Sequence, residues 1–172
     1  MSNVLINGRT AVHAGSGGIL NTIDVCKTQI GNSIVPIPYP NIAESKDADA
    51  TASTVFINGH PVCTAASVFA SSTGDQPGKK GGLRSGSTQG AAEFITSSPN
   101  VFIEGEPAVR MGDLMVSNDG NTPPAPLMQP GGPMPPELRA AAVNSVEAPV
   151  SHHLDYKFTH TLLGTVLLQN TP

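Results

Sequence analysis

Two histidines and two cysteines in the first half of the chain are residue types that bind zinc: His13, Cys26, His60 and Cys63. Imidazole nitrogens and thiolate sulfurs are the usual donors of a tetrahedral zinc centre. Two pairs are candidates, His13 with Cys26 and His60 with Cys63. Whether either pair could converge on one ion depends on the elements that carry these side chains.

Motifs for phosphate binding and for nucleophilic catalysis are each narrowly missed. Gly74 stands one residue too close to Gly78 for a phosphate-binding loop, and Lys80 occupies the place of the hydroxyl that would bind magnesium. Ser87 directly follows a glycine, so the spacing of a nucleophile elbow is absent. The carboxylates are scattered, and neither helix nor strand spacing pairs them for acid–base work. We therefore expect that this protein is not an enzyme.

The elements that must position these residues follow from a pattern that occurs three times, near residues 3–16, 54–67 and 98–113. In each copy a short apolar run ending in isoleucine precedes a turn with glycine, and a second short run follows. Apolar and β-branched runs on both sides of such a turn are typical of a β-hairpin. An ungapped internal repeat constrains the whole architecture. The sequence therefore predicts an all-β fold built on three similar hairpins.

Alignment of the three copies assigns a position to each candidate ligand. His60 aligns with charged residues in the predicted exposed turn, and Cys63 aligns with valines on a predicted apolar face. Neighbouring side chains in a strand point to opposite faces, so we expect a turn histidine and a small core thiol at these two positions. His13 ends the second strand of its hairpin and Cys26 follows in the next loop. This pair is the better zinc candidate, although a bound zinc ion is not favoured.

Composition and charge exclude several classes of protein. Charged residues make up 13% of the 172 residues, with 18 glycines, 16 prolines and a net charge of −4. A negative net charge argues against a nucleic-acid partner, since phosphates must be neutralised by cations. No apolar stretch approaches the roughly 20 residues that span a bilayer. The N-terminus lacks the pattern of a signal peptide, and two cysteines fit a reducing compartment. We expect synthesis in the cytoplasm without a signal peptide.

Proline and glycine mark the predicted domain boundaries. Residues 1–127 would form the hairpin domain, 128–136 a Pro/Gly-rich linker, and 137–172 a C-terminal extension with a short helix and then one or two strands. Within the domain, prolines alternate at positions 36, 38 and 40. Alternating prolines forbid a helix and predict an extended or polyproline segment.

The third copy resembles the PAAR family of spike-tip proteins. Gly105 to Asp113 matches the pattern Gly-x-Pro-Ala-Ala-Arg-x-Gly-Asp, with Val109 in place of the second alanine. Further segments are similar to the PAAR-like branch of that family: residues 24–26, 36–41, 72–78 and 85–88. The motifs cover about residues 3–127.

The resemblance implies a small pseudo-threefold cone of β-hairpins that caps and sharpens the trimeric spike of a type VI secretion system or a related contractile injection machine. Such a tip would dock or carry effector or adaptor proteins, would meet a target membrane only by puncture, and would be exported by the machine itself. Typical members bind zinc near the vertex with three histidines and one cysteine, and this sequence departs from that pattern. Three similar hairpins could offer similar edges to three spike subunits, with six candidate interface residues: Val4, Ile6, Val55, Ile57, Val101 and Ile103.

Two alternatives remain open. The chain could be a small secreted effector with its activity in the C-terminal extension, where only four residues could serve catalysis: His152, His153, Asp155 and His160. It could also be a free-standing binding module, which would be monomeric and stable without a spike partner.

Overall fold

The structure, a computed structural model, describes residues 3–131, which belong to a compact unit bounded by Met1–Pro135. Most of the predicted linker and the whole predicted C-terminal extension lie outside the described residues. Within them the elements are β-strands and one short 3-10 turn, η1 (Ser45–Asp47). The prediction of an all-β fold is confirmed. No helix in this part of the chain is long and apolar enough to cross a membrane.

Three two-stranded hairpins share one register and one turn conformation. They pair β1 (Leu5–Ile6) with β2 (Arg9–Thr10), β6 (Phe56–Ile57) with β7 (His60–Pro61), and β11 (Phe102–Ile103) with β12 (Glu106–Pro107). The two turn residues have positive φ in every case, at 51° and 77°, 52° and 79°, and 53° and 88°. A tight turn with two left-handed residues matches the twist of the flanking strands. Glycine at the second turn position therefore makes each hairpin possible.

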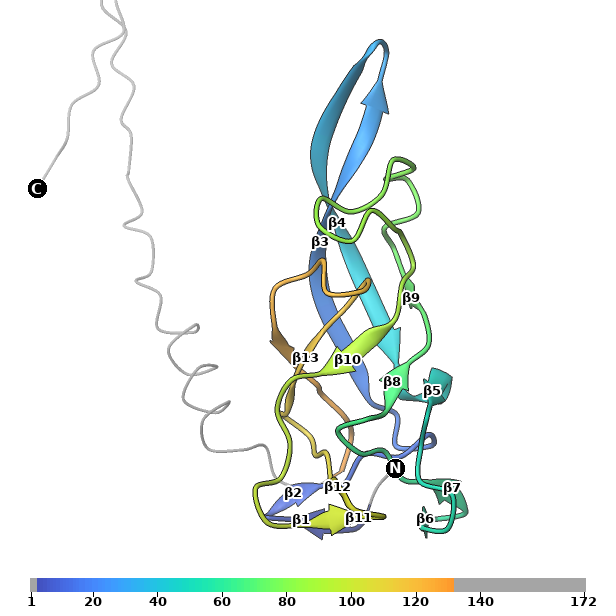
Figure 1. The fold of residues 1–172 in the computed structure, drawn as a ribbon, viewed down its shortest axis with the longest axis vertical. Coiled ribbons are helices and arrows are strands. Elements are labelled where there is room, and N and C mark those ends of the chain that lie inside the picture. Colours follow the sequence, from blue (N-terminus) through green and yellow to red (C-terminus); the bar gives the residue numbers. More distant parts are fainter. Residues whose placement is uncertain (1–2, 132–172) are drawn as a thin grey trace, which may run out of the picture. The chain divides into compact units, whose positions relative to one another are not determined.

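Backbone bridges join the small hairpins in a cyclic order. A residue just after the second strand of each hairpin bridges a residue that follows a neighbouring hairpin, and the ring closes after three steps. The antiparallel bridges are Ala11–Arg110, Ala108–Thr64 and Val62–His13. Figure 1 shows the three hairpins together at one end of the described unit. Each hairpin is thereby held by the other two rather than by a sheet of its own.

A long hairpin rises from this end. Strand β3 (Ile19–Ile30) pairs with β4 (Ser33–Glu44) along their whole length. Strand β9 (Ser72–Thr73) adds a short third strand beside residues 42–43 of β4. In Figure 1 the turn between β3 and β4 lies at the opposite end of the unit from the three small hairpins. The segment with alternating prolines, predicted as extended or polyproline, is therefore the middle of a strand.

A five-stranded sheet packs beside the long hairpin. Its order is β14 (Ala125–Pro126), β13 (Leu114–Val116), β10 (Ala92–Phe94), β8 (Val68–Phe69) and β5 (Ala48–Asp49), all antiparallel. One apolar core lies under these strands and includes Leu20, Phe69, Met115 and Leu127. A second, smaller core lies among the three small hairpins and includes Ile6, Ile57 and Val62.

Candidate functional site

The three small hairpins expose large apolar side chains at equivalent positions. Leu5, Phe56 and Phe102 each begin the first strand of their hairpin, and their exposed fractions are 54%, 55% and 59%. We call these three residues the hairpin face. Isolated exposed apolar residues are ordinary, but three at matched positions of three joined hairpins form a repeated apolar feature.

The predicted interface residues divide between this exterior and the small core. Val4 and Val55 are exposed, whereas Ile6 and Ile57 are buried in the core between the hairpins. Val101 and Ile103 are partly buried against the same core. Side chains alternate in a strand, so burial of each isoleucine turns the preceding leucine or phenylalanine outward. The sequence analysis missed the hairpin face, although this alternation could have identified it.

Polar side chains fasten each turn to a neighbouring hairpin. The Asn7 amide donates to Asn100 Oδ1 at 2.9 Å, and the Asn58 amide donates to Asn3 Oδ1 at 3.3 Å. At the equivalent place in the third hairpin, Glu104 accepts hydrogen bonds from the Ser53 and Thr54 backbone N–H groups. The hydrogen bond from the Thr54 hydroxyl, together with these two N–H bonds, lowers the pKa of Glu104 to about 2.

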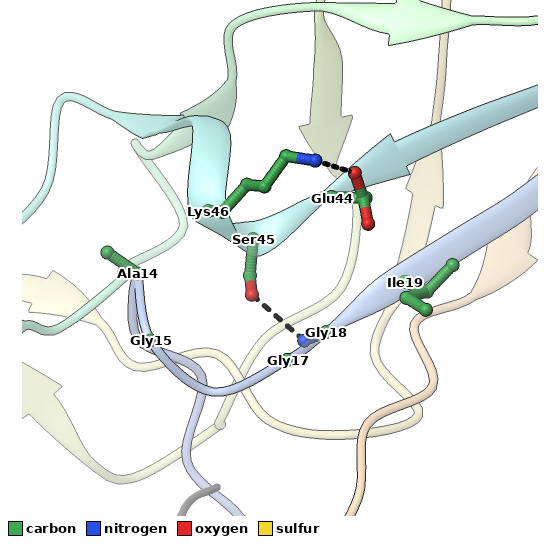
Figure 2. A pocket seen from close by; sticks show the side chains of 8 residues that line it. All are labelled: Ala14, Gly15, Gly17, Gly18, Ile19, Glu44, Ser45 and Lys46. Carbon is green, nitrogen blue, oxygen red and sulfur yellow. Dashed lines mark hydrogen bonds and ion pairs between the residues drawn. The ribbon is translucent and has the colours of Figure 1, made fainter.

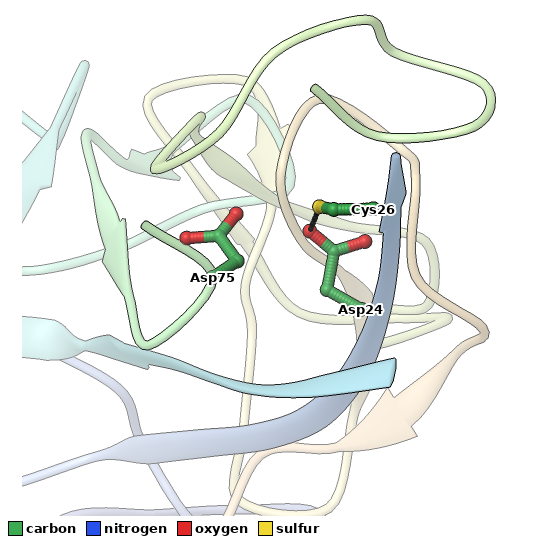
Figure 3. Close-up of side chains that lie close together, drawn as sticks. All are labelled: Asp24, Cys26 and Asp75. Carbon is green, nitrogen blue, oxygen red and sulfur yellow. Dashed lines mark hydrogen bonds between the residues drawn. The ribbon is translucent and has the colours of Figure 1, made fainter. Parts of the chain in front are cut away.

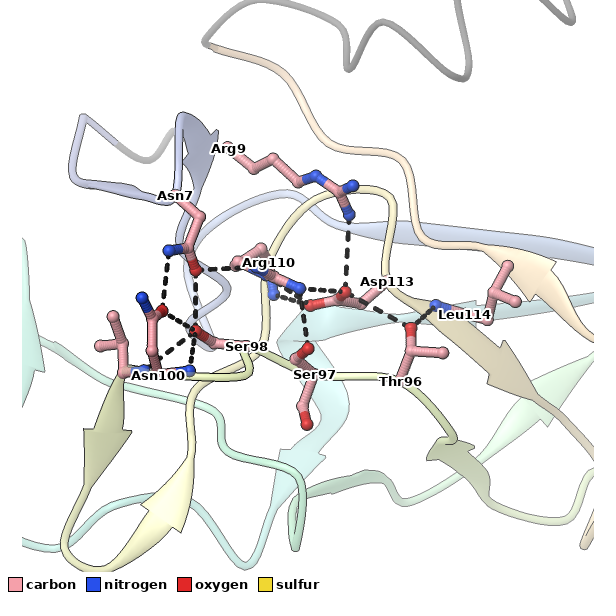
Figure 4. Close-up of polar contacts among 10 residues, drawn as sticks. Asn7, Arg9, Thr96, Ser97, Ser98, Asn100, Arg110, Asp113 and Leu114 are labelled. Atoms are coloured by element: carbon pink, nitrogen blue, oxygen red, sulfur yellow. Dashed lines mark hydrogen bonds and ion pairs between the residues drawn. The ribbon is translucent and has the colours of Figure 1, made fainter.

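A buried ion pair supports the third hairpin (Figure 4). Arg110 Nη2 lies 2.9 Å from Asp113 Oδ1, and Arg110 Nε donates to Asp113 Oδ2 at 3.0 Å. The same guanidinium donates to Asn7 Oδ1 and to the Ser97 carbonyl, both at 2.8 Å. Each polar group of the pair is thus hydrogen-bonded, as burial of charge requires. The Arg-x-Gly-Asp segment therefore acts as a structural clamp between the first and third hairpins.

His13 and His60 lie together. Their rings are stacked with centroids 5.6 Å apart, and His13 is buried while His60 is exposed. The Gly15 N–H donates to His13 Nδ1 at 3.2 Å, and His13 Nε2 has no hydrogen-bond partner among residues 3–131. Burial and the neighbouring His60 lower the pKa of His13. The His60 ring covers Gly15, where an added Cβ would come within 2.3 Å of it.

Cys26 lies in a different group, with Asp24 and Asp75 (Figure 3). One ligand-type atom from each of these buried residues lies within 4.8 Å of the others. The Cys26 thiol donates to Asp24 Oδ2 at 3.3 Å, and Asn118 donates to the same oxygen at 2.7 Å. Burial, reinforced by Asp24, raises the pKa of Cys26 to about 12. Burial also raises the pKa of Asp75.

The arrangement of these side chains does not fit a zinc centre. Cys63 is fully buried in the larger apolar core, where burial raises its pKa to about 12. Within residues 3–131 only the Asp24–Cys26–Asp75 group brings three candidate ligands together, and neither histidine belongs to it. Its carboxylates already accept hydrogen bonds from Asn118, Asn121 and the Gln89 N–H. The group lacks the imidazole ligands of the predicted zinc pairs, and its carboxylates are already hydrogen-bonded, so it is a poor zinc site.

A pocket of about 260 Å³ opens where the loop after the first hairpin meets η1 (Figure 2). Three of its eight lining residues are glycines. Ser45 Oγ accepts a hydrogen bond from the Gly18 N–H at 2.9 Å, and Lys46 pairs with Glu44 at the rim. A catalytic site needs a nucleophile beside a base or paired acids. The lining of this pocket supplies neither arrangement, so it offers no evident chemistry.

Three joined hairpins, matched exposed apolar residues and a clamp that holds the hairpins together characterise this domain of the all-β class. Comparison of the sequence with known protein families and proteins identifies the family. A model described as the toxin PAAR-like domain matches residues 17–124, and the chain belongs to that family. The DNase toxin Tse7 of Pseudomonas aeruginosa is 35% identical over 118 residues, which cover 61% of this chain and 31% of the toxin. No solved structure is significantly similar to the chain.

The chain covers 31% of that relative's length, so the similarity concerns a domain and not the whole toxin. The family confirms the resemblance predicted from Gly105–Asp113 and the accompanying segments. The tail residues predicted for catalysis in the effector alternative, His152, His153, Asp155 and His160, lie outside the described residues.

Proposed function

We propose that residues 3–131 form the tip that caps the trimeric spike of a contractile injection system, with the hairpin face against the spike. The observation that carries the proposal is the closed ring of three hairpins with Leu5, Phe56 and Phe102 exposed at equivalent positions. A threefold partner would meet three similar apolar contacts, and a single chain would thereby match three identical subunits. In this role the domain binds and does not catalyse.

Apolar contact at this face explains its composition. Burying a leucine or phenylalanine side chain that is otherwise exposed to water contributes about 1.5–3 kcal/mol. The three side chains are about half exposed, so their burial against a spike is a substantial part of a stable interface. Two flanking valines, Val4 and Val55, are also exposed.

Co-purification with the trimeric spike protein of the same organism tests the proposal. Replacement of Leu5, Phe56 and Phe102 by aspartate, singly and together, should abolish capture of the spike. Ile95→Asp is a matched control, because Ile95 is 50% exposed and lies outside the hairpins. Aspartate at Ile57 would be a poorer test, since a buried charge could unfold the small core. Full capture of the spike by the triple variant would overturn the proposal.

We propose further that the domain carries effector activity into a target, as a fused or docked cargo, and is exported with the spike. The similarity to a protein named a DNase toxin supports this role, because most of that toxin lies beyond the shared domain. Expression of residues 131–172 alone tests the competing assignment: toxicity to the expressing cell would place activity in the extension.

A further inference from the structure

The far end of the long hairpin is an uncharged projection that exposes three large apolar side chains. Residues 28–35, which we call the finger, form the end of the β3–β4 hairpin. Ile30 and Ile34 are 55% and 56% exposed, and Val35 is also exposed. Within residues 28–43 there is no Asp, Glu, Lys or Arg. The finger has three residue pairs and a two-residue turn, so at about 3.3 Å per residue its paired part extends about 10 Å.

Strand addition along β4 is blocked directly below the finger. Pro36, Pro38 and Pro40 alternate along that strand, directly opposite Lys27, Val25 and Ile23 of β3. A proline in a paired strand has no N–H to offer, and it is tolerated where this position faces away from the partner strand. The outer edge of β4 therefore lacks backbone N–H donors at three alternate residues. Docking of a protein by edge-to-edge pairing is disfavoured there.

The neighbouring edge of β3 is covered only as far as the base of the finger. The Lys27 N–H donates to the Gly81 carbonyl at 2.9 Å, and the Lys80 N–H donates to the Lys27 carbonyl at 3.1 Å. Beyond Lys27, among residues 3–131, no other strand pairs with the two strands of the finger. At the tip, the Gln29 side-chain amide donates to the Gly31 carbonyl at 2.7 Å. This side chain therefore supplies a hydrogen-bond donor to one backbone carbonyl of the turn.

Four cations lie at this base. Lys27 belongs to β3, and the loop against it carries the other three: Lys79, Lys80 and Arg84, all exposed. We call these four residues the collar. None of them forms an ion pair with a carboxylate among residues 3–131. The chain has nine lysines and arginines in total and a net charge of −4, so a collar of four unpaired cations is a local excess.

We propose that the finger inserts its apolar end into the surface of an anionic lipid bilayer while the collar binds the lipid head groups. An interfacial segment reaches about 5–10 Å into the head-group and acyl boundary, which the finger is long enough to do. Stable membrane attachment generally requires two signals, and an apolar element beside a cluster of cations supplies both. Each cation near an anionic surface adds attraction that salt weakens. A nucleic acid would use the collar but would leave Ile30, Ile34 and Val35 in water.

A single-tryptophan reporter tests the proposal, because the sequence contains no tryptophan. The full chain with Ile34→Trp is titrated with vesicles of zwitterionic lipid alone and with vesicles that hold about a third anionic lipid. We expect the emission maximum to move to shorter wavelength with the anionic vesicles and much less with the neutral ones. Ile30→Trp is the second reporter if the first variant fails to fold. Phe56→Trp on the hairpin face is the matched control and should not shift.

Further variants separate the two parts of the surface. In the Ile34→Trp chain, Lys79→Gln with Lys80→Gln should raise the vesicle concentration for half-maximal shift by about tenfold or more. Ile30→Ser with Val35→Ser, in the Phe56→Trp or wild-type chain, should abolish co-sedimentation with vesicles. All four positions are exposed, so the thermal midpoint should stay unchanged.

The proposal is overturned if neither finger reporter shifts, if Phe56→Trp shifts equally, or if the lysine variants bind anionic vesicles as tightly as the parent. Binding of short duplex DNA in preference to the vesicles would also overturn it and assign the collar to nucleic acid. The inference is independent of spike docking, since these experiments use the free chain. Loss of spike capture by hairpin-face variants would leave the vesicle-induced shift intact.

Discussion

Gly78 leaves room for Cys26: a Cβ added to Gly78 would lie 2.2 Å from the Cβ of Cys26. The contact holds the loop that carries the lysine pair against β3, beside the Asp24–Cys26–Asp75 group. Gly78 does not have a left-handed φ, so a substitution there tests packing rather than backbone freedom.

Gly78→Ala should destabilise the protein by about 1–3 kcal/mol, the range for an overpacked interior. Denaturant unfolding measures the change. Because the clash is between two Cβ atoms, Cys26→Gly in the same chain should relieve it. The double variant should then be more stable than the sum of the single losses predicts. Additive losses would show that the two positions do not meet as described.

Removal of one partner of the Arg110–Asp113 pair should be costly. Both side chains are almost fully buried, so Asp113→Asn leaves a guanidinium without its counter-charge. We expect a loss of about 3 kcal/mol in the free energy of unfolding, since breaking a buried pair strands the other charge. Thermal and denaturant unfolding measure it.

The exposed pair Lys46–Glu44 is the matched control. Lys46→Gln should produce no measurable change, because exposed ion pairs are hydrated and screened. An Asp113→Asn variant as stable as Lys46→Gln would contradict the role of the Arg110–Asp113 clamp.

The three small hairpins could be predicted from sequence because their signals are local. Each glycine turn lies between two short apolar runs, and the pairs found at residues 5–10, 56–61 and 102–107 fall inside the three predicted copies. The bridges between hairpins join residues far apart in the chain. Nothing in a local window indicates them.

The pairing of the long hairpin and the Asp24–Cys26–Asp75 group could not be predicted from local sequence signals. Pro36 and its alternating partners predicted an extended segment, but the pairing with β3 depends on prolines facing the open edge, which only the assembled sheet reveals. Asp24 and Asp75 meet because a loop folds back over β3, and no spacing rule links them. The predicted pair His13 and Cys26 is divided between two groups for the same reason, since His13 stacks on His60 instead.

The stability that Glu104 contributes should depend on pH. Its pKa in the folded protein is about 2, below the ordinary value of 4.5, because the Thr54 hydroxyl and two N–H groups bind the carboxylate. A lowered folded-state pKa means that the contribution is complete above about pH 4.5 and is lost as the pH falls through about 2. Glu104→Gln should therefore lower the denaturant midpoint at neutral pH and match the wild type near pH 2.

Glu106→Gln is the control on the same hairpin, because Glu106 has no side-chain hydrogen bond among residues 3–131. Its unfolding midpoint should follow that of the wild type at every pH. A constant difference between Glu104→Gln and the wild type from neutral to acidic pH would show that the bonds to Ser53 and Thr54 do not depend on the charge.

Both thiols should be unreactive in the folded protein. Cys26 and Cys63 are buried, and the pKa of each is raised to about 12, so near pH 8 only about one molecule in ten thousand carries the thiolate. Ellman's reagent should react orders of magnitude more slowly with the native chain than with the chain in guanidinium, where two equivalents should appear.

Mass spectrometry of the untagged protein should find less than about half an equivalent of zinc. A chelator that sped the native reaction and released zinc would show that the thiolates hold a metal, because removal of a bound ion is the step that would expose them.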